Sequence, residues 1–326
     1  MQDFAEFYEE CERAPRLHEF ANFFSSTAGG RSGRPLSRPR LDHRLLPKDP
    51  LLDRFAKLHE LRQGPFDQHY LSSIPYRFEE ECRLGYAILK YAQARRKPMK
   101  FYSLGTAEGT MARTISELSQ GRVQTLSCSP NIENLQSFYA YGVPPHARFF
   151  HGPFHHLTPE RIDSDDYLQT FADGFDIILE DTTFQMYSPN RYDQIRFVRQ
   201  HLRKDGLFMF VEKFLHNDKG EYRRREKQKD SGFKIRHFSD DDIKTKEDVV
   251  LNSMDKNEIT LEQMVQIVIG HFSHCVVTWN SGNFYTIVAG DHTSNIDRFV
   301  GGLSSPAIPA EYAYEALPLK FNAAHR

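Results

Sequence analysis

Hydrophobic residues in the central part of the chain fall into seven short, nearly continuous runs, and helix-like segments separate the first five. Only Ser281-Gly282, a turn signal typical of an antiparallel hairpin, separates the last two runs. Strands that alternate with helices pair in parallel and are covered on both faces. The pattern therefore predicts an α/β fold with a doubly wound, seven-stranded sheet, mostly parallel, and a C-terminal antiparallel hairpin. The predicted strands are 100–105, 123–128, 147–152, 175–181, 207–213, 274–280 and 283–291.

The N-terminal part of the chain has helical periodicity instead. Phe4, Phe7 and Tyr8 share one helical face that needs a packing partner. Residues 29–50 contain Gly, Pro and six basic side chains, which is typical of a loop or arm. This arm is either a solvated linker or a lid that touches a substrate. The predicted organisation is a helical N-terminal extension (1–77), an α/β domain (78–292) with an insertion (214–270), and a C-terminal tail (293–326).

Two parts of the predicted insertion have a recognisable pattern. Residues 219–229 carry six positive and two negative charges, so an anionic substrate, including RNA, is a possible partner if this segment and the arm flank a cleft. The alternative is a solvated charged helix. Further on, Ser239 with the three aspartates after it is a helix-capping signal, and residues 259–272 form an amphipathic helix that we expect to pack on the sheet.

Composition narrows the class of protein. The 326 residues are 39% hydrophobic and 26% charged with a net charge of −2, which is ordinary for a globular protein. The four cysteines form no C-x-x-C pair, so neither a zinc ribbon nor a disulfide framework is indicated. No 18 apolar residues run together and no export signal is visible, so we expect a cytoplasmic protein without a membrane partner.

The turn after the first predicted strand contains the clearest ligand-binding signal. Gly105 and Gly109, with the small Ala107 between them, sit between a strand and a helix, where glycine permits unusual backbone conformations and close approach of a ligand. The turn resembles the glycine-rich first motif of class I S-adenosylmethionine-dependent methyltransferases. FDIILEDTTF and LRKDGLFMFVEK are similar to that family's fourth- and fifth-strand motifs, in the same order, and the terminal hairpin is similar to its sheet.

This resemblance implies S-adenosyl-L-methionine as cofactor and methyl transfer to a small or medium-sized substrate. Three carboxylates common in the family are replaced here by Ser103, Ser127 and Pro153. Glu108 or Glu133 could supply a carboxylate from a neighbouring turn. The alternatives are a non-catalytic methyltransferase-fold protein that binds a partner or assembles, and an RNA methyltransferase. A nicotinamide-dependent enzyme is disfavoured, because no carboxylate follows the second strand.

The resemblance and the positions of the strand ends give a set of candidate site residues. For catalysis we predict Asp181 as the preferred base, with His155 and Tyr187 as further candidates. Glu212 and Lys213, at the end of the fifth strand, face the substrate or form an ion pair with each other, and we favour the pair. No metal site is predicted, because no histidine spacing suggests one. The predicted cofactor-binding residues are Ser103, Gly105, Thr106, Ala107, Glu108, Gly109, Ser127, Phe154 and Asp181.

Overall fold

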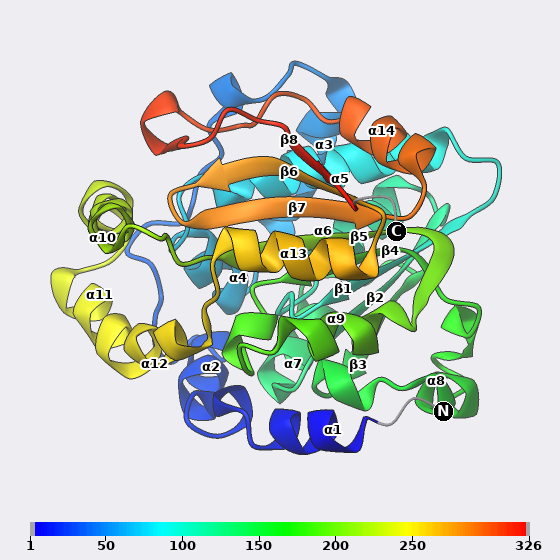
Figure 1. Ribbon diagram of the computed structural model, residues 1–326, viewed down its shortest axis with the longest axis horizontal. Helices are drawn as coiled ribbons and strands as arrows, with labels where there is room; N and C mark the ends of the chain where they lie inside the picture. Colours follow the sequence, from blue (N-terminus) through cyan, green and yellow to red (C-terminus); the bar gives the residue numbers. More distant parts are fainter. Residues whose placement is uncertain (1–3, 324–326) are drawn as a thin grey trace.

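A single sheet of eight strands organises the protein (Figure 1), whose computed structural model describes residues 4–323. The spatial order is β3-β2-β1-β4-β5-β7-β6-β8. Strands β1 to β5 are parallel, and β7 runs antiparallel to β5 and to β6. The strands are β1 (Met99–Leu104), β2 (Val123–Ser129), β3 (Ala147–His151), β4 (Phe175–Asp181), β5 (Leu202–Lys213), β6 (His274–Ser281), β7 (Phe284–Gly290) and β8 (Leu319–Asn322).

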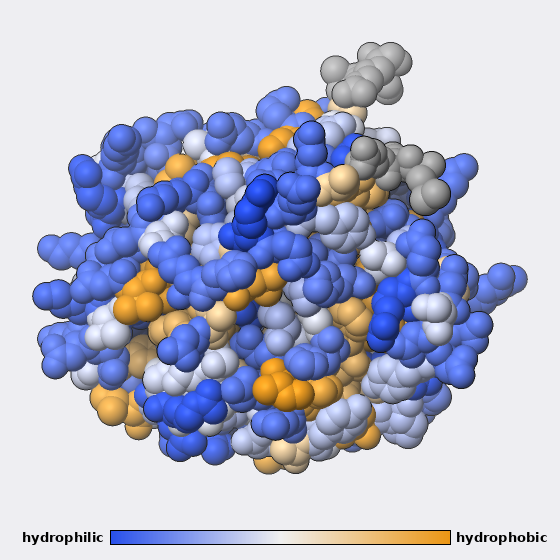
Figure 2. All heavy atoms as spheres, turned by 90° about the horizontal axis from the view of Figure 1, so that it is seen from below, coloured by the Kyte–Doolittle hydropathy of each residue, from blue (hydrophilic) through white to orange (hydrophobic). Residues whose placement is uncertain are grey.

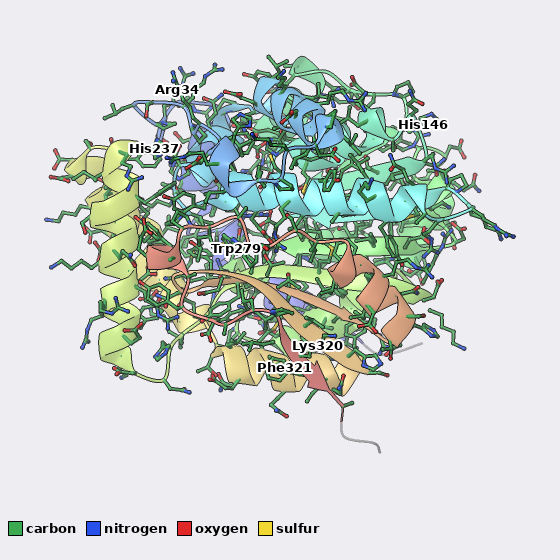
Figure 3. All side chains as sticks on the ribbon, turned by 90° about the horizontal axis from the view of Figure 1, so that it is seen from above. Arg34, His146, His237, Trp279, Lys320 and Phe321 are labelled. Carbon is green, nitrogen blue, oxygen red and sulfur yellow. The ribbon has the colours of Figure 1, made fainter. Side chains whose placement is uncertain are left out.

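The predicted fold class is confirmed, and the strand count is corrected from seven to eight. All seven predicted strands are present and the last two form the antiparallel hairpin. The additional strand β8 pairs antiparallel with β6, at the edge of the sheet where Figure 3 labels Lys320 and Phe321. Its four residues alternate between half-buried and exposed, so it lacks the continuous hydrophobic run by which the other strands were recognised.

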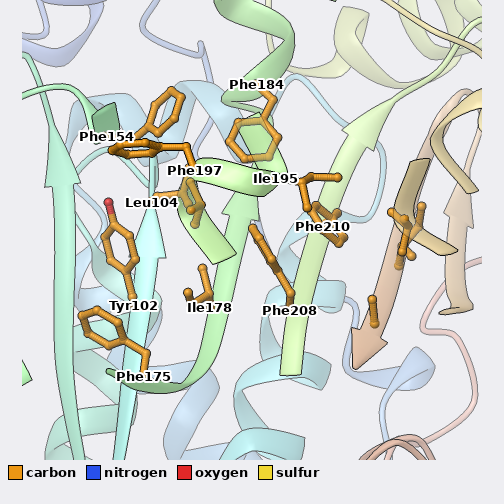
Figure 4. Close-up of a cluster of buried hydrophobic side chains, with 14 of the residues drawn as sticks. Tyr102, Leu104, Phe154, Phe175, Ile178, Phe184, Ile195, Phe197, Phe208 and Phe210 are labelled. Atoms are coloured by element: carbon orange, nitrogen blue, oxygen red, sulfur yellow. The ribbon is translucent and has the colours of Figure 1, made fainter. Parts of the chain in front are cut away.

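Helices cover both faces of the sheet, because successive strand residues point to opposite faces and both sets are apolar. Tyr102 and Leu104 belong to the core on one face, where α1, α9 and α13 pack, whereas Phe101 belongs to the core on the other, beneath α3, α5, α6 and α14. Figure 4 shows the first core, in which Phe208 and Phe210 stack at 4.2 Å between ring centroids. The helices are α1 (Ala5–Glu12), α2 (Ala21–Ala28), α3 (Pro50–Arg62), α4 (Pro65–Leu71), α5 (Arg77–Gln93), α6 (Thr110–Leu118), α7 (Ile132–Ala140), α8 (Pro159–Ser164), α9 (Arg191–Arg199), α10 (Lys219–Gln228), α11 (Asp240–Lys246), α12 (Asn252–Met254), α13 (Leu261–His271) and α14 (Thr293–Gly301).

The aromatic face of the first helix finds its partner on α9. The rings of Phe4, Phe7 and Tyr8 lie 5.1–5.7 Å from the ring of Phe197. The expected packing of 259–272 is also found, since α13 buries Met264, Val265 and Val268 in the same core.

The basic arm lies along the insertion. The backbone N–H of Leu36 donates to the carbonyl of His237 at 2.7 Å, and Figure 3 shows Arg34 and His237 at the same end of the molecule.

The face of the molecule on the side of α1 and α2 is mostly hydrophilic. Its hydrophobic side chains form small separate groups (Figure 2). Among the helices of residues 4–323, none combines the length and the apolar character needed to cross a bilayer.

Candidate active site

The strand order reverses between β1 and β4, and ligands of doubly wound sheets bind at the carboxyl ends of strands at such a reversal. A cleft of about 1020 Å³ lies there. It extends from the ends of β1, β2 and β4, past Phe154, to Lys213 at the end of β5. Helices α2 and α4 and residues 229–254 supply its other walls. We call this the larger cleft.

A second cleft of about 370 Å³ adjoins the first, and Gly105 and Ala107 line both. Three carboxylates line this smaller cleft, those of Asp67, Glu81 and Asp181. The glycine-rich turn therefore stands between an acidic cleft and the larger cleft.

Close packing explains both glycines of the turn. Gly105 has φ +72°, and a Cβ there would lie 1.4 Å from Oγ1 of Thr183, at the end of β4. Gly109 has φ +64°, and a Cβ there would lie 2.3 Å from Oγ of Ser127. Both positions need the left-handed conformation and the missing side chain. The turn is thus pressed against the ends of the two strands that flank β1.

Asp181 is held by two side chains, those of Tyr70 on α4 and Arg77 at the start of α5. Nη2 of Arg77 donates to one carboxylate oxygen at 2.6 Å, and the hydroxyl of Tyr70 donates to the other at 2.5 Å. Burial raises the pKa of Asp181, while the charge of Arg77 acts in the opposite direction. Both carboxylate oxygens are therefore engaged, although the side chain lines the smaller cleft.

Asp67 is less well satisfied than Asp181. Its Oδ2 is buried without a hydrogen-bond partner among the described residues. Burial raises its pKa well above the usual range, and the neighbouring Glu108 raises it further. Glu108 itself accepts from the backbone N–H groups of Phe66 and Asp67, at 2.8 and 2.9 Å, in the first turn of α4. Its carboxylate lines neither cleft.

The predicted site residues divide into two groups. Those that line a cleft are Gly105, Thr106, Ala107, Phe154, Asp181 and Tyr187. Those that lie behind the cleft walls are Ser103, Glu108, Gly109, Ser127 and His155.

Ser103 and Ser127, which stand where the family resemblance led us to expect carboxylates, are both buried. Ser103 donates to Oγ1 of Thr106 at 2.9 Å, which braces the turn. Oγ of Ser127 has no hydrogen-bond partner in the part of the chain that the structure describes. The polar groups that reach the larger cleft from the end of β2 and from α7 are instead those of Ser129 and Asn134. Glu133, the other alternative carboxylate, pairs with Arg31 at 3.0 Å.

His155 forms a cluster that the sequence did not predict. Its Nε2 lies 3.0 Å from Oε1 of Glu12, which His156 also contacts. Burial lowers the pKa of His155 to about 4. Ligand atoms of these three side chains lie within 4.8 Å of one another, so this group could hold a metal ion. Sequence reasoning missed it because Glu12 is distant along the chain, on α1.

The two charged residues that end β5 do not pair with each other, contrary to the ion pair that we favoured. Glu212 accepts from Arg191 at 2.8 Å, whereas Lys213 pairs with Glu258 at 2.8 Å and with Glu226 at 3.2 Å. Adjacent residues of a strand point to opposite faces, which separates their side chains. Lys213 lines the larger cleft and Glu212 does not.

Sequence reasoning also missed most of the larger cleft's outer wall. Arg16, Phe24 and His69 reach it from the N-terminal extension, and three lysines reach it from the insertion. No residue of the arm 29–50 lines either cleft. Clustered lysines at 219–229 gave a partial signal, since Lys229 is one of the three.

Comparison with known proteins gave matches to solved structures only. No family model matches the chain, and no curated protein matches it by sequence. The chain is similar to the plantazolicin methyltransferase BpumL in complex with SAH, with 11% identity and a TM-score of 0.45 over 75% of this chain and 100% of that one. The chain is also similar to the plantazolicin methyltransferase BamL, with 10% identity and a TM-score of 0.46 over 74% of this chain and 97% of that one. A third similar structure is that of the pyocyanin biosynthetic protein PhzM, with 14% identity and a TM-score of 0.39 over 71% of this chain and 60% of that one.

Proposed function

We propose that this protein binds S-adenosyl-L-methionine across the Gly105–Ala107 turn and transfers its methyl group to a small molecule held in the larger cleft. The observation that carries the proposal is the meeting of two clefts of opposite character at this turn, at the reversal of strand order. A cofactor with an amino-acid end that carries an ammonium group, and with a nucleoside end, needs two such neighbouring environments.

The smaller cleft suits the amino-acid end of the cofactor. Asp181 and Glu81 are already paired with Arg77, but Oδ2 of Asp67 has no hydrogen-bond partner among the described residues. It can accept from an ammonium group, whose charge would also favour the ionised form of Asp67. Gly105, Thr106 and Ala107 bring the chain close to the same space. We assign Asp181 to this binding role, together with Asp67 and Glu81.

The inner part of the larger cleft suits the adenosine end. Phe154 offers an aromatic surface for a base. Asn134 offers Oδ1, which is buried and has no partner among residues 4–323. From the family resemblance we expected a carboxylate that accepts hydrogen bonds from the ribose hydroxyls. Here the neutral side chains of Ser129 and Asn134 would take its place. A neutral acceptor makes a weaker hydrogen bond than a carboxylate, so we expect moderate cofactor affinity.

Methyl transfer is a displacement at a sulfonium carbon, and the cofactor supplies the methyl group. The chain's contribution is to align the acceptor and keep water away. Tyr187 lines the larger cleft, and burial raises its pKa, so it stays protonated at neutral pH and can donate a hydrogen bond to a bound substrate. The ring of His155 lies 5.7 Å from that of Tyr187. We therefore assign His155 to positioning Tyr187.

Calorimetric titration with S-adenosylmethionine and, separately, with S-adenosylhomocysteine tests the proposal. We expect micromolar binding, with the product bound more tightly. Trp279 gives a second readout, because it packs in one cluster with Ile74 and Phe284, which line the larger cleft. A screen of acceptors with isotopically labelled methyl donor should then detect transfer.

Two outcomes contradict the proposal in different ways. No heat at millimolar cofactor would mean that the missing carboxylates abolish binding. Cofactor binding without transfer to any acceptor would favour the second candidate, a non-catalytic binding protein of this fold. The observation that favours this candidate is that both oxygens of Asp181 are already engaged by Arg77 and Tyr70.

A further inference from the structure

The charged side chains that line the larger cleft are all basic. Among residues 4–323 they are Arg16, Lys213, Lys229, Lys234 and Lys246, and no carboxylate lines this cleft. Lys213 ends β5 and shares Glu226 with Lys229, and the charges of Lys229 and Lys234 act on Lys246, so the four lysines are neighbours. A cation in such a lining is costly unless a carboxylate of the fold or a bound anion compensates it.

The acidic partners of three of these lysines lie outside the cleft lining. Lys213 pairs with Glu226 and Glu258, as described above, and Lys229 also contacts Glu226. Lys234 pairs with Asp230 at 2.7 Å. The charges of these three lysines are therefore compensated by carboxylates that do not line the cleft.

Lys246, at the end of α11, is different. It forms no ion pair with a carboxylate in the described part of the chain, and its contacts are to neutral groups. Its Nζ lies 2.7 Å from Nε2 of His69 and donates to Oγ of Ser73 at 2.9 Å. Burial lowers the pKa of Lys246 well below its usual range, and the charges of Lys234 and Lys229 lower it further, while Asp230 acts in the opposite direction.

The hydrogen bonds around Lys246 leave one of its donors free. Nδ1 of His69 lies 2.7 Å from the carbonyl oxygen of Gly33, which can only accept, so Nδ1 carries the proton and Nε2 accepts from Lys246. Ser73 donates its own hydrogen to the carbonyl of His69 at 2.7 Å, so its oxygen also accepts from Lys246. A bound anion favours the charged form of Lys246, and an ammonium has three N–H donors, so one remains for that anion.

We propose that Lys246, with Lys234, forms an anion subsite that holds a carboxylate or phosphate group of the substrate, and that the substrate's body is apolar. The apolar part follows from a hydrophobic cluster that lines the same cleft and consists of Phe23, Phe24, Phe66, Val250, Leu251 and Met254. This inference rests on the proposed function, since it names the class of molecule that would accept the methyl group.

Calorimetry with three matched probes tests the subsite: benzoate, phenyl phosphate and the uncharged benzamide, in a buffer without phosphate. We expect at least one anion to bind about tenfold or more tightly than benzamide, and the tighter anion identifies the headgroup. Lys246→Met should weaken anion binding about tenfold and leave benzamide unchanged. Lys246→Arg should retain the preference for the anion. Lys219→Met is the control, because Lys219 is exposed on α10 and lines neither cleft.

Two results would overturn the subsite: anions that bind no more tightly than benzamide, and anion binding that is unchanged in Lys246→Met. Titration of each variant with S-adenosylhomocysteine separates this inference from the proposed function. Normal binding of that ligand without anion preference removes the subsite alone. Anion preference without binding of S-adenosylhomocysteine removes the proposed cofactor alone.

Discussion

The two clefts that meet at Gly105 and Ala107 hold opposite charges in different ways. In the smaller cleft the carboxylate of Asp181 is compensated by the buried guanidinium of Arg77, while Asp67 keeps a free oxygen. In the larger cleft most lysines are compensated by carboxylates behind the wall, while Lys246 keeps a free donor. Each cleft thus contains an ionisable group with a hydrogen-bonding position that the fold leaves unfilled, and there we expect a ligand of opposite charge. Arg16, which also lines the larger cleft, forms no ion pair among the described residues, but its guanidinium donates to Asn131 and lies over the ring of Phe24.

The largest effect should come from removing Arg77, the buried cation that compensates the carboxylate of Asp181 in the smaller cleft. Arg77→Met leaves Asp181 buried without its cation, which costs about 3–5 kcal/mol of unfolding free energy. Urea unfolding followed by Trp279 fluorescence measures it. Arg44→Met is the matched control, because Arg44 pairs with Asp42 at the exposed surface, where solvent screens the pair, and its loss should leave stability almost unchanged.

Equal stability of Arg77→Met and wild type would show that the compensation is unimportant. The double variant Arg77→Met with Asp181→Leu should recover part of the loss, since it removes both charges.

The next effect concerns the turn between the clefts. Gly105→Ala should cost about 1–3 kcal/mol through a strained left-handed backbone, with the clash against Thr183 in addition. It should also weaken binding of S-adenosylhomocysteine by about tenfold or more, because Thr183 must move. Gly282→Ala is the control: its φ is +61°, but a Cβ there meets nothing within 4 Å. Equal affinities of the two variants in calorimetry would contradict a role of the turn in binding.

The open carboxylate of the smaller cleft should reveal itself in the pH dependence of stability. The pKa of Asp67 is raised in the folded protein, so the folded state binds the proton more tightly than the unfolded chain. Stability is therefore lost as pH rises from the unfolded pKa through the raised folded pKa. Asp67→Asn should remove this loss and be more stable than wild type at the upper end, by about 1 kcal/mol or more.

Thermal unfolding between pH 4 and pH 8 measures this difference. The exposed Asp163→Asn serves as control and should follow wild type at every pH. A constant difference between Asp67→Asn and wild type across the range would mean that Asp67 does not titrate there.

The smallest effect should come from replacing Lys246 in the larger cleft. We expect this change to raise the free energy of unfolding, whereas loss of a residue that stabilises the fold would lower it. The pKa of Lys246 is lowered in the folded protein, so the folded state binds this proton less tightly than the unfolded chain. Lys246 therefore costs no stability above its unfolded pKa, and the free energy of unfolding falls as pH drops below that value. At neutral pH, Lys246→Met should therefore stabilise the protein by about 0.5–1 kcal/mol. His69, Lys229, Lys234 and Asp230 face the same group and stay unchanged.

Differential scanning calorimetry without ligand measures the change. A lower melting temperature for Lys246→Met would show that Lys246 stabilises the fold and would remove the argument that its charge is kept for a ligand.

The sequence predicted the sheet well and the site only in part. Seven of the eight strands were predicted within a few residues, except for the five additional residues at the start of β5, because strands buried on both faces are continuous apolar runs; β8 has no such run and was missed. Gly105 and Asp181 line the clefts, and the sequence places them at strand ends because each lies directly at the end of such a run. Glu108 was predicted to bind the cofactor, but its carboxylate turns towards the N-terminus of α4, a direction that no local pattern encodes.

The sequence by itself determined the α/β class, the strand order along the chain and the position of the glycine turn, because these depend on local periodicity and on residues close together in the chain. Only the tertiary structure decided which charges face a ligand. Arg77 meets Asp181, and Lys246 meets His69, across more than one hundred residues. Such pairs depend on the packing of helices from the N-terminal extension and the insertion around the strand ends, and on which way each side chain points. Those directions set the acidic and the basic cleft on either side of the same turn.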